Sequence, residues 1–197
     1  MGVTRERFDQ GITYDAYKAQ MTRNRDRLDA AEAGVKIDAD DLSAFKKLPK
    51  SVNVVALAED WCGDVIANLP VLGTLAKDSG KLNVRVFLRD QNDDIMQQYL
   101  NRGEFKSIPV FVFFDESFKQ LGVFTERPES VTKLRAEKRA EIFKQNPDLG
   151  SPETPADQLP EDKRAKLMQL TGKMRDDTAP FANKEVVKAL RAIAGAA

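Results

Sequence analysis

The sequence contains no histidine and only one cysteine, Cys62, among its 197 residues. Without histidine, a catalytic triad that uses an imidazole base is excluded, and a tight transition-metal site lacks its usual ligands. A single cysteine cannot form an internal disulfide and is typical of proteins in a reducing compartment. We therefore expect a cytoplasmic protein that carries no metal ion and no other cofactor.

An excess of positive charge is also missing, because Lys and Arg number 31 and Asp and Glu number 31. Nucleic acids and anionic membranes both attract concentrated positive charge, so neither is an expected partner. No apolar run approaches the roughly 20 residues that cross a bilayer. The first ten residues are charged where a signal peptide would be apolar.

What the sequence does contain is ordinary for a globular protein, with 42% hydrophobic and 31% charged residues. Its length favours one hydrophobic core with extensions. Two helices are predicted before residue 50, because apolar side chains recur there at helical spacing. The first begins after Thr13 and the second ends before Pro49, and their apolar positions are Tyr14, Tyr17, Met21 and Leu28, then Leu42 and Phe45.

The middle of the chain alternates between short apolar runs and amphipathic segments, which predicts strands and helices in turn. The helix over 64–77 contains Pro70, which we expect to interrupt it, and Gly80 as its stop. The expected elements are strand 51–58, helix 64–77, strand 82–88, helix 93–100, strands 109–114 and 121–124, and helix 130–145. Helical crossovers followed by a hairpin predict an α/β protein with a mixed sheet and helices on both faces.

The character of the sequence changes after residue 145. Four prolines within 146–160 predict an extended linker, and two short helices are expected over 161–177 and 183–193. We therefore divide the chain into a domain over 1–145 and a C-terminal extension over 146–197. The extension is expected to pack on that domain, with a second subunit or another protein as the alternative, and the sequence leaves the oligomeric state open.

Several short motifs resemble thioredoxin when they are taken together, over about residues 51–145. A cysteine stands at a strand-to-helix junction, a proline follows it by eight residues, and an Ile-Pro pair precedes the predicted hairpin. The motifs are Trp61-Cys62-Gly63-Asp64, Pro70, Asp90-Gln91-Asn92 and Ser107-Ile108-Pro109. The segments LRDQN and NLPVL narrow the resemblance to a bacterial thioredoxin-like family. The resemblance implies a thioredoxin fold with N-terminal and C-terminal helical extensions.

The resemblance also implies an active-site corner with Cys62 as its nucleophile. Unpaired backbone N–H groups at the start of a helix favour the thiolate, which is the nucleophile in disulfide exchange. In the family the proline that matches Pro109 is cis, and the loop at Ile108 holds an extended substrate beside the cysteine. The expected substrate-binding residues are Trp61, Gly63, Asp64, Arg89, Ile108 and Pro109.

Three positions depart from the thioredoxin pattern. The second cysteine of the family falls at Val65, so an ordinary dithiol cycle is excluded. The family's buried acid falls at Ala56 and its lysine partner at Val86, so the usual proton relay is missing as well.

Charged side chains around the corner have opposite expected effects on the pKa of the Cys62 thiol. Glu59, Asp60 and Asp64 are expected to raise the pKa of the thiol, although acids at a helix start also complement its dipole. Arg89 is the one nearby cation that the sequence identifies, and we expect it to pair with Asp64 or with the thiolate.

Two functions of different classes follow. The first is a thiol–disulfide oxidoreductase that uses Cys62 and an external resolving thiol, with a protein or small-molecule thiol or disulfide as substrate. The alternative is a redox-inactive binding module that uses the groove beside Trp61 and Pro109. A peroxiredoxin-type peroxidase is disfavoured, because those enzymes are similar in having a threonine three residues before their cysteine, and this chain has Glu59 at that position.

Overall fold

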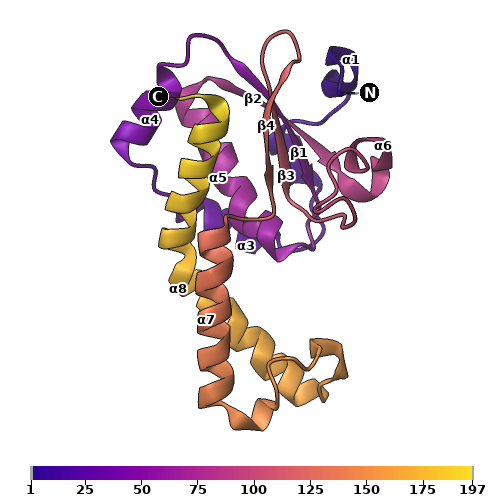
Figure 1. Ribbon diagram of the computed structural model, residues 1–197, viewed down its shortest axis with the longest axis vertical. Helices are drawn as coiled ribbons and strands as arrows, with labels where there is room; N and C mark the ends of the chain where they lie inside the picture. Colours follow the sequence, from indigo (N-terminus) through magenta and orange to yellow (C-terminus); the bar gives the residue numbers. More distant parts are fainter. Residues whose placement is uncertain (1, 197) are drawn as a thin grey trace. The chain divides into compact units, whose positions relative to one another are not determined.

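The computed structural model describes residues 2–196. They fall into two compact units, in which Pro128–Ala182 form the second and the remaining described residues form the first. The first unit contains the sheet and the helices that flank it (Figure 1). None of the helices in residues 2–196 combines the length and the hydrophobicity that crossing a bilayer requires.

Four strands form one sheet in the order β2-β1-β3-β4. Strand β1 (Val52–Ala58) pairs in parallel with β2 (Leu82–Leu88) and antiparallel with β3 (Val110–Phe114), which pairs antiparallel with β4 (Gln120–Thr125). Every residue of β1 and β3 is buried, as expected for strands covered on both faces. The predicted mixed sheet is therefore confirmed, and β1 occupies a central position.

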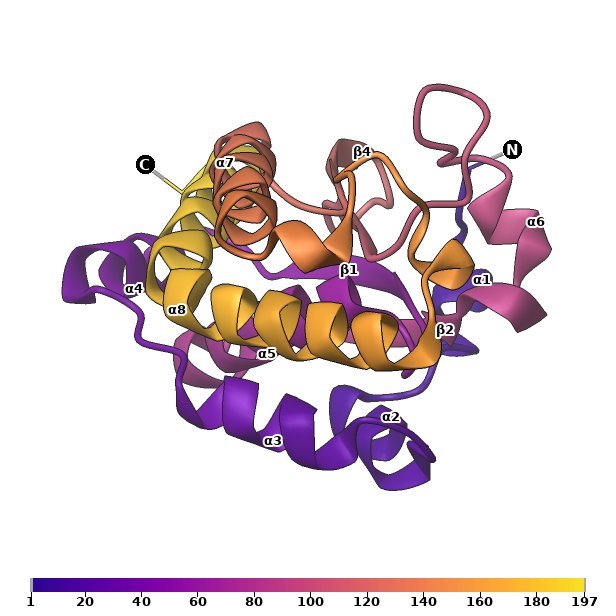
Figure 2. The ribbon, with the colours of Figure 1, turned by 90° about the horizontal axis from the view of Figure 1, so that it is seen from below.

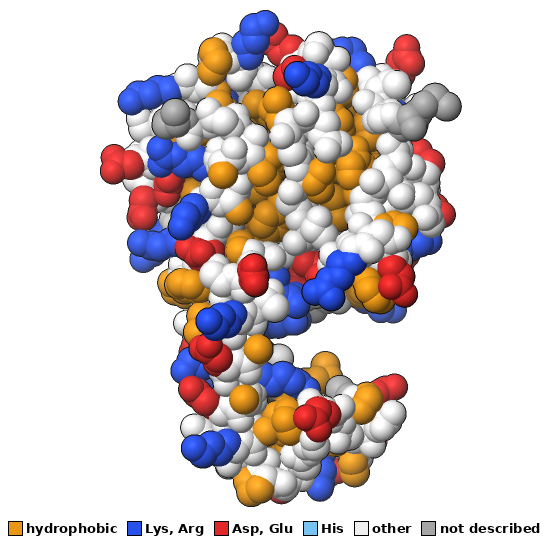
Figure 3. Space-filling model, viewed as in Figure 1, with side chains coloured by type: hydrophobic (Ala, Val, Ile, Leu, Met, Phe, Trp, Pro, Cys, Tyr) orange, Lys and Arg blue, Asp and Glu red, His pale blue; other side chains and the backbone are white. Residues whose placement is uncertain are grey.

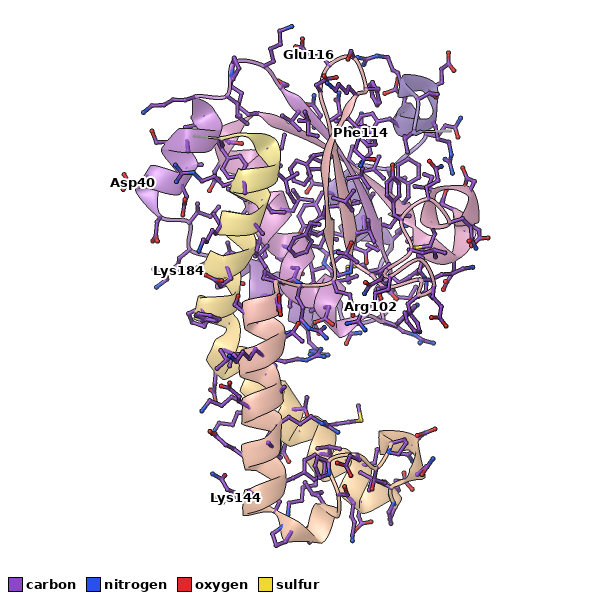
Figure 4. The ribbon with its side chains drawn as sticks, in the orientation of Figure 1. Asp40, Arg102, Phe114, Glu116, Lys144 and Lys184 are labelled. Atoms are coloured by element: carbon purple, nitrogen blue, oxygen red, sulfur yellow. The ribbon has the colours of Figure 1, made fainter. Side chains whose placement is uncertain are left out.

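The two antiparallel strands form the predicted hairpin. Its turn is held by the Asp115 carboxylate, which accepts hydrogen bonds from the backbone N–H groups of Ser117 and Lys119 at 2.8 and 3.0 Å. Phe114 lies at the end of β3 and Glu116 at the tip of the turn (Figure 4). Strand β4 is an edge strand, and Figure 3 shows hydrophobic side chains gathered on this face of the first unit.

Helix α5 (Gly63–Ser79) connects β1 to β2 and ends at Gly80, which adopts a left-handed conformation with a φ of 64°. The expected interruption at Pro70 is wrong, because the helix continues through that residue. Its packing explains the continuity, since Leu69, Leu72 and Leu75 are completely buried in the core. Burial of these side chains offsets the hydrogen bond that a proline removes from the helix.

The N-terminal segment forms four helices, although only two were predicted. The expected helix through Tyr14 and Leu28 is broken, because residues 21–24 separate its two halves and Asn24 has a φ of 54°. The Asn24 side-chain amide donates to the Asp60 carbonyl at 2.8 Å, which fixes the break against the end of β1. The helices are α1 (Arg5–Asp9), α2 (Tyr14–Gln20), α3 (Arg25–Ala33) and α4 (Ala39–Lys46), and α3 lies against α5 (Figure 2).

A short 3₁₀ turn, η1 (Arg89–Gln91), and helix α6 (Asp93–Met96) follow β2. The predicted helix over 93–100 is therefore shorter than expected. The backbone after α6 turns through Arg102, which has a φ of 56°, and Gly103, which has a φ of 74°. Before that turn, the Gln98 and Tyr99 N–H groups already donate to the carbonyls three residues earlier, those of Ile95 and Met96, both at 3.0 Å, so the α-helical pattern has ended there.

The last part of the chain also belongs to the first unit. Val186, Val187 and Leu190 are buried in its core, and Ile193 packs against Gly122 of β4. A Cβ atom at Gly122 would lie 2.9 Å from the Ile193 Cγ2 atom, so this close approach requires glycine. An ion pair between Arg191 and Asp41, 2.8 Å between Nη1 and Oδ1, adds a polar contact.

The second unit contains helix α7 (Glu129–Gln145), the 3₁₀ turns η2 (Pro147–Leu149) and η3 (Ala156–Gln158), and the first part of α8 (Glu161–Ala194). Two predictions are wrong here. The two expected helices are one continuous helix that contains Pro180, and the region 146–160 is not an extended linker. Leu149 and Leu159 of this region are buried in a small hydrophobic cluster, together with Phe143 and Leu167 from the neighbouring helices.

The two compact units do not coincide with the division of the chain that the sequence predicts. Helix α7 groups with the residues that follow it, whereas the sequence places a boundary at residue 146. The predicted division into 1–145 and 146–197 stays a prediction about domains that fold independently. Met168, in the part of α8 that belongs to the second unit, is 68% exposed.

Candidate functional site

The corner between β1 and α5 places Cys62 at the N-cap position of the helix. Its backbone is extended, with φ −85° and ψ 118°, and its carbonyl accepts the first helical hydrogen bond, from the Ile66 N–H at 3.0 Å. The side chain is half-buried, between the core and the solvent. Backbone N–H groups of the first turn and the positive end of the helix dipole both favour a thiolate at this position.

A second loop lies opposite the cysteine. The peptide bond between Ile108 and Pro109 is cis, and the Cys62 Sγ atom lies 3.5 Å from the Ile108 carbonyl oxygen. The Pro109 carbonyl accepts a hydrogen bond from the Glu126 N–H at 2.8 Å, which ties the loop to the end of β4. Two segments that are 46 residues apart in sequence therefore meet at the thiol.

Asp64, in the first turn of α5, forms an ion pair with Arg127. Asp64 is only 8% exposed, so this contact compensates a charge that has little access to water. The sequence analysis missed Arg127. The predicted hairpin held the signal, because antiparallel pairing of β3 and β4 returns residues after Thr125 to the level of Pro109.

The other two acidic residues of the corner are bound by neighbouring loops. The Glu59 carboxylate accepts a hydrogen bond from the Asp90 N–H at 2.8 Å, and burial raises the pKa of Glu59. The Asp60 carboxylate accepts hydrogen bonds from the backbone N–H groups of Thr22 and Arg23, at 2.8 and 3.0 Å. Both acids therefore hold chain segments in place around the corner, in addition to the charge that they carry.

Arg89 has different partners from those predicted. Its guanidinium forms an ion pair with Asp90 at 2.6 Å and donates to the Lys106 carbonyl at 3.1 Å, so the expected pairing with Asp64 is wrong. The same group lies 4.8 Å from the ring centroid of Trp61, a cation–π contact.

Trp61 is 43% exposed, and the arginine stacked on it restricts the indole. Gly63 is the first residue of α5. The structure thus brings Trp61, Cys62 and Ile108 to one end of the sheet, with Arg89 against the indole. In residues 2–196 no three side chains of Asp, Glu or Cys are grouped to hold a metal ion.

The three positions that depart from the thioredoxin pattern are all apolar and buried. Val65 and Ala56 have no exposed surface, and Val86 is 1% exposed. Val65 lies one helical turn after Cys62, where a second thiol would stand. The corner therefore offers one thiol, next to an apolar interior with no acid–lysine pair at the positions of Ala56 and Val86.

The sheet order, the cis-proline loop and the cysteine at a helix start define a thioredoxin-fold protein. A family model described as thioredoxin matches residues 11–140, which is well over half of the chain. The chain belongs to this thioredoxin family.

Solved structures agree with this fold. A protein of unknown function from Pseudomonas aeruginosa is 16% identical and has a TM-score of 0.61, over 90% of this chain and 99% of that one. An HIV epitope scaffold of the 4E10 series is 15% identical and has a TM-score of 0.63, over 96% of both chains. Among curated proteins, none matches the sequence significantly.

Proposed function

We propose that the protein is a thiol–disulfide oxidoreductase that works through Cys62 and an external resolving thiol. One observation carries the proposal: the Cys62 side chain stands at the start of α5 and faces the Ile108 carbonyl at 3.5 Å, beside a cis proline. A helix start favours the thiolate, and the opposing loop offers backbone groups to an extended substrate.

The reaction is an exchange of disulfide bonds. The Cys62 thiolate attacks one sulfur of a substrate disulfide, a new S–S bond forms to Cys62, and the second substrate sulfur leaves as a thiolate that takes a proton from water. An external thiolate then attacks the substrate sulfur of this mixed disulfide and releases Cys62. Because Val65 has no sulfur, resolution depends on that external thiol, which a reducing compartment such as the cytoplasm supplies.

Substrate binding is assigned to the residues around the thiol. Trp61 is exposed and stacked by Arg89, so it presents a fixed aromatic surface beside Cys62. The Ile108–Pro109 loop lies on the other side of the sulfur. Gly63 and Asp64 complete the start of α5, where Arg127 balances the carboxylate. A disulfide in an extended peptide, or a small-molecule disulfide, fits this arrangement.

The departures at Val65, Ala56 and Val86 favour a second candidate function. All three are buried and apolar, so the groups that resolve and protonate intermediates in thioredoxins are absent from these positions. A binding module that uses the same surface without turnover requires none of them. The two functions make opposite predictions for the reactivity of Cys62.

The experiment measures that reactivity directly. The protein is incubated with glutathione disulfide at neutral pH, and its mass is then measured by mass spectrometry. In a second measurement, the pH dependence of iodoacetamide alkylation gives the thiol pKa. We expect a mixed disulfide that persists until a thiol is added, and a pKa below the ordinary ~8.5. The Cys62→Ser variant is the control and should show neither adduct. A pKa of ~8.5 or higher together with no mixed disulfide would reject the redox function in favour of the binding module.

A further inference from the structure

Glu126, the residue that follows β4, has a left-handed backbone with a φ of 55°. Residues other than glycine are uncommon in this conformation, and those that adopt it at functional sites are held there by the structure around them. The Glu126 N–H donates to the Pro109 carbonyl at 2.8 Å, so this residue borders the loop that faces Cys62. Its conformation therefore affects where that loop lies.

A buried asparagine of α5 holds the Glu126 backbone. The Asn68 side-chain amide donates to the Glu126 carbonyl at 2.6 Å, and Asn68 is 1% exposed. Its neighbour Leu69 is completely buried, so the amide is a polar group next to the apolar core of the helix, where a hydrogen bond is needed to offset the cost of its burial. The bond ties the segment after β4 to the helix that begins at Cys62.

A second asparagine holds the Glu126 side chain. The Asn101 amide donates to the Glu126 Oε2 atom at 2.9 Å and to the Ser107 Oγ atom at 3.2 Å. The backbone of Asn101 also pairs with that of Phe105, with N–H to O distances of 2.8 and 3.0 Å. Glu126 is thereby joined to the residue that directly precedes Ile108.

Glu126 thus reaches the Ile108–Pro109 loop from both of its ends. Its N–H binds the carbonyl of Pro109, and its carboxylate is linked through Asn101 to Ser107. Its own carbonyl is fixed to α5, which carries the thiol. The separation of 3.5 Å between the Cys62 sulfur and the Ile108 carbonyl is therefore set by a network with Glu126 at its centre.

We propose that Glu126 is a positioning residue, which makes the site prefer a disulfide within an extended peptide to the same disulfide without flanking residues. This inference rests on the proposed function. Held by Asn68 and Asn101, Glu126 keeps the Ile108–Pro109 loop where its backbone groups meet the residues that flank the substrate disulfide. A disulfide without flanking residues makes no such contacts and gains nothing from the position of the loop.

The test uses two probes that contain the same disulfide. One is an alanine-rich peptide whose single cysteine is coupled to thionitrobenzoate, and the other is N-acetylcysteine methylamide coupled in the same way. The Cys62 thiolate attacks the cysteine sulfur, an S–S bond forms to Cys62, and thionitrobenzoate leaves as a coloured thiolate that is followed by its absorbance. We expect the parent protein to react at least about fivefold faster with the peptide, the effect of about one hydrogen bond.

Two substitutions of Glu126 form the matched pair. Glu126→Gly adopts a positive φ without steric cost but loses the contact with Asn101 and frees the backbone, whereas Glu126→Gln keeps an oxygen that accepts from Asn101. Glu126→Gly should lower the rate with the peptide about fivefold and leave the rates with the short probe and with iodoacetamide unchanged. Glu126→Gln should retain the preference of the parent for the peptide.

Asn101→Ala provides a second route to the same result and should reduce the preference for the peptide in the same direction. Its control is Asn83→Ala, because the Asn83 amide donates to Asn53 at the opposite end of β2 and should not affect the preference. Equal rates of the parent with both probes, or a preference unchanged in Glu126→Gly and Asn101→Ala, would overturn the positioning role alone. An equal fall in all three reactions in these variants would also overturn it, because it would show a general effect on the thiol. Release of no thiolate from either probe by the parent would reject the proposed function, and the positioning role with it.

Discussion

The two sides of the turn between β1 and α5 differ in how their polar groups are satisfied. On the side of Cys62, the Asp64 carboxylate has Arg127 as an ion-pair partner. On the other side of the turn, the Tyr17 hydroxyl is buried without any hydrogen bond, near the carboxylates of Glu59 and Asp60. A polar group that the chain itself satisfies supports the structure, whereas a buried one without a partner costs stability.

On the side of Cys62, placing a second thiol at Val65 should have the largest effect on the rate of disulfide exchange. Val65 lies three residues after Cys62, on the same side of α5, so Val65→Cys converts resolution into an intramolecular step. We expect insulin reduction with dithiothreitol to accelerate on the order of tenfold or more. The double variant Cys62→Ser/Val65→Cys is the control and should return to the background rate. An unchanged rate in the single variant would mean that Cys62 does not form the first mixed disulfide.

Removal of the cation at the corner should have the next largest effect. Arg127→Ala leaves the Asp64 charge without its ion pair in the first turn of α5, which raises the pKa of the thiol. Iodoacetamide alkylation at neutral pH should slow about threefold. Arg89→Ala is the matched variant and should change the rate less, because Arg89 pairs with Asp90.

The cause of that slowing can be isolated by a second substitution. Asp64→Asn combined with Arg127→Ala removes the charge that the arginine balances, so the alkylation rate should recover. If Arg89→Ala slows alkylation more than Arg127→Ala does, the assignment of the balancing cation to Arg127 is wrong.

Substitution of Glu59, on the other side of the turn, should have the smallest effect, and the effect is on stability. Burial raises the pKa of Glu59 in the folded state, so the folded protein binds its proton more tightly than the unfolded chain does. The contribution of Glu59 to the free energy of unfolding is therefore greatest below the ordinary pKa and falls as the pH rises through the raised value. Glu59→Gln should be more stable relative to the parent at pH 7 than at pH 4, in thermal melts at matched ionic strength. A relative stability that favours the variant more at pH 4 would reverse this sign.

The two compact units show how far sequence patterns reach. Strands β1 and β2, the hairpin and helix α5 were predicted within one or two residues, because each follows from a local run of apolar side chains. The break at Asn24 was missed, because it depends on a hydrogen bond to the Asp60 carbonyl, 36 residues away. The helix α8 was expected as two, because the sequence around Pro180 gives no sign that the helix continues.

The sequence by itself determined the family, the sheet and the position of Cys62 at a helix start, because these depend on local periodicity and short motifs. The tertiary structure decided which charges meet. Asp64 and Arg127 are 63 residues apart, and only the register of the β3–β4 hairpin brings them together. It also decided that the Tyr17 hydroxyl is buried without a partner, because that depends on how α2, the Glu59–Asp60 turn and β2 pack around it.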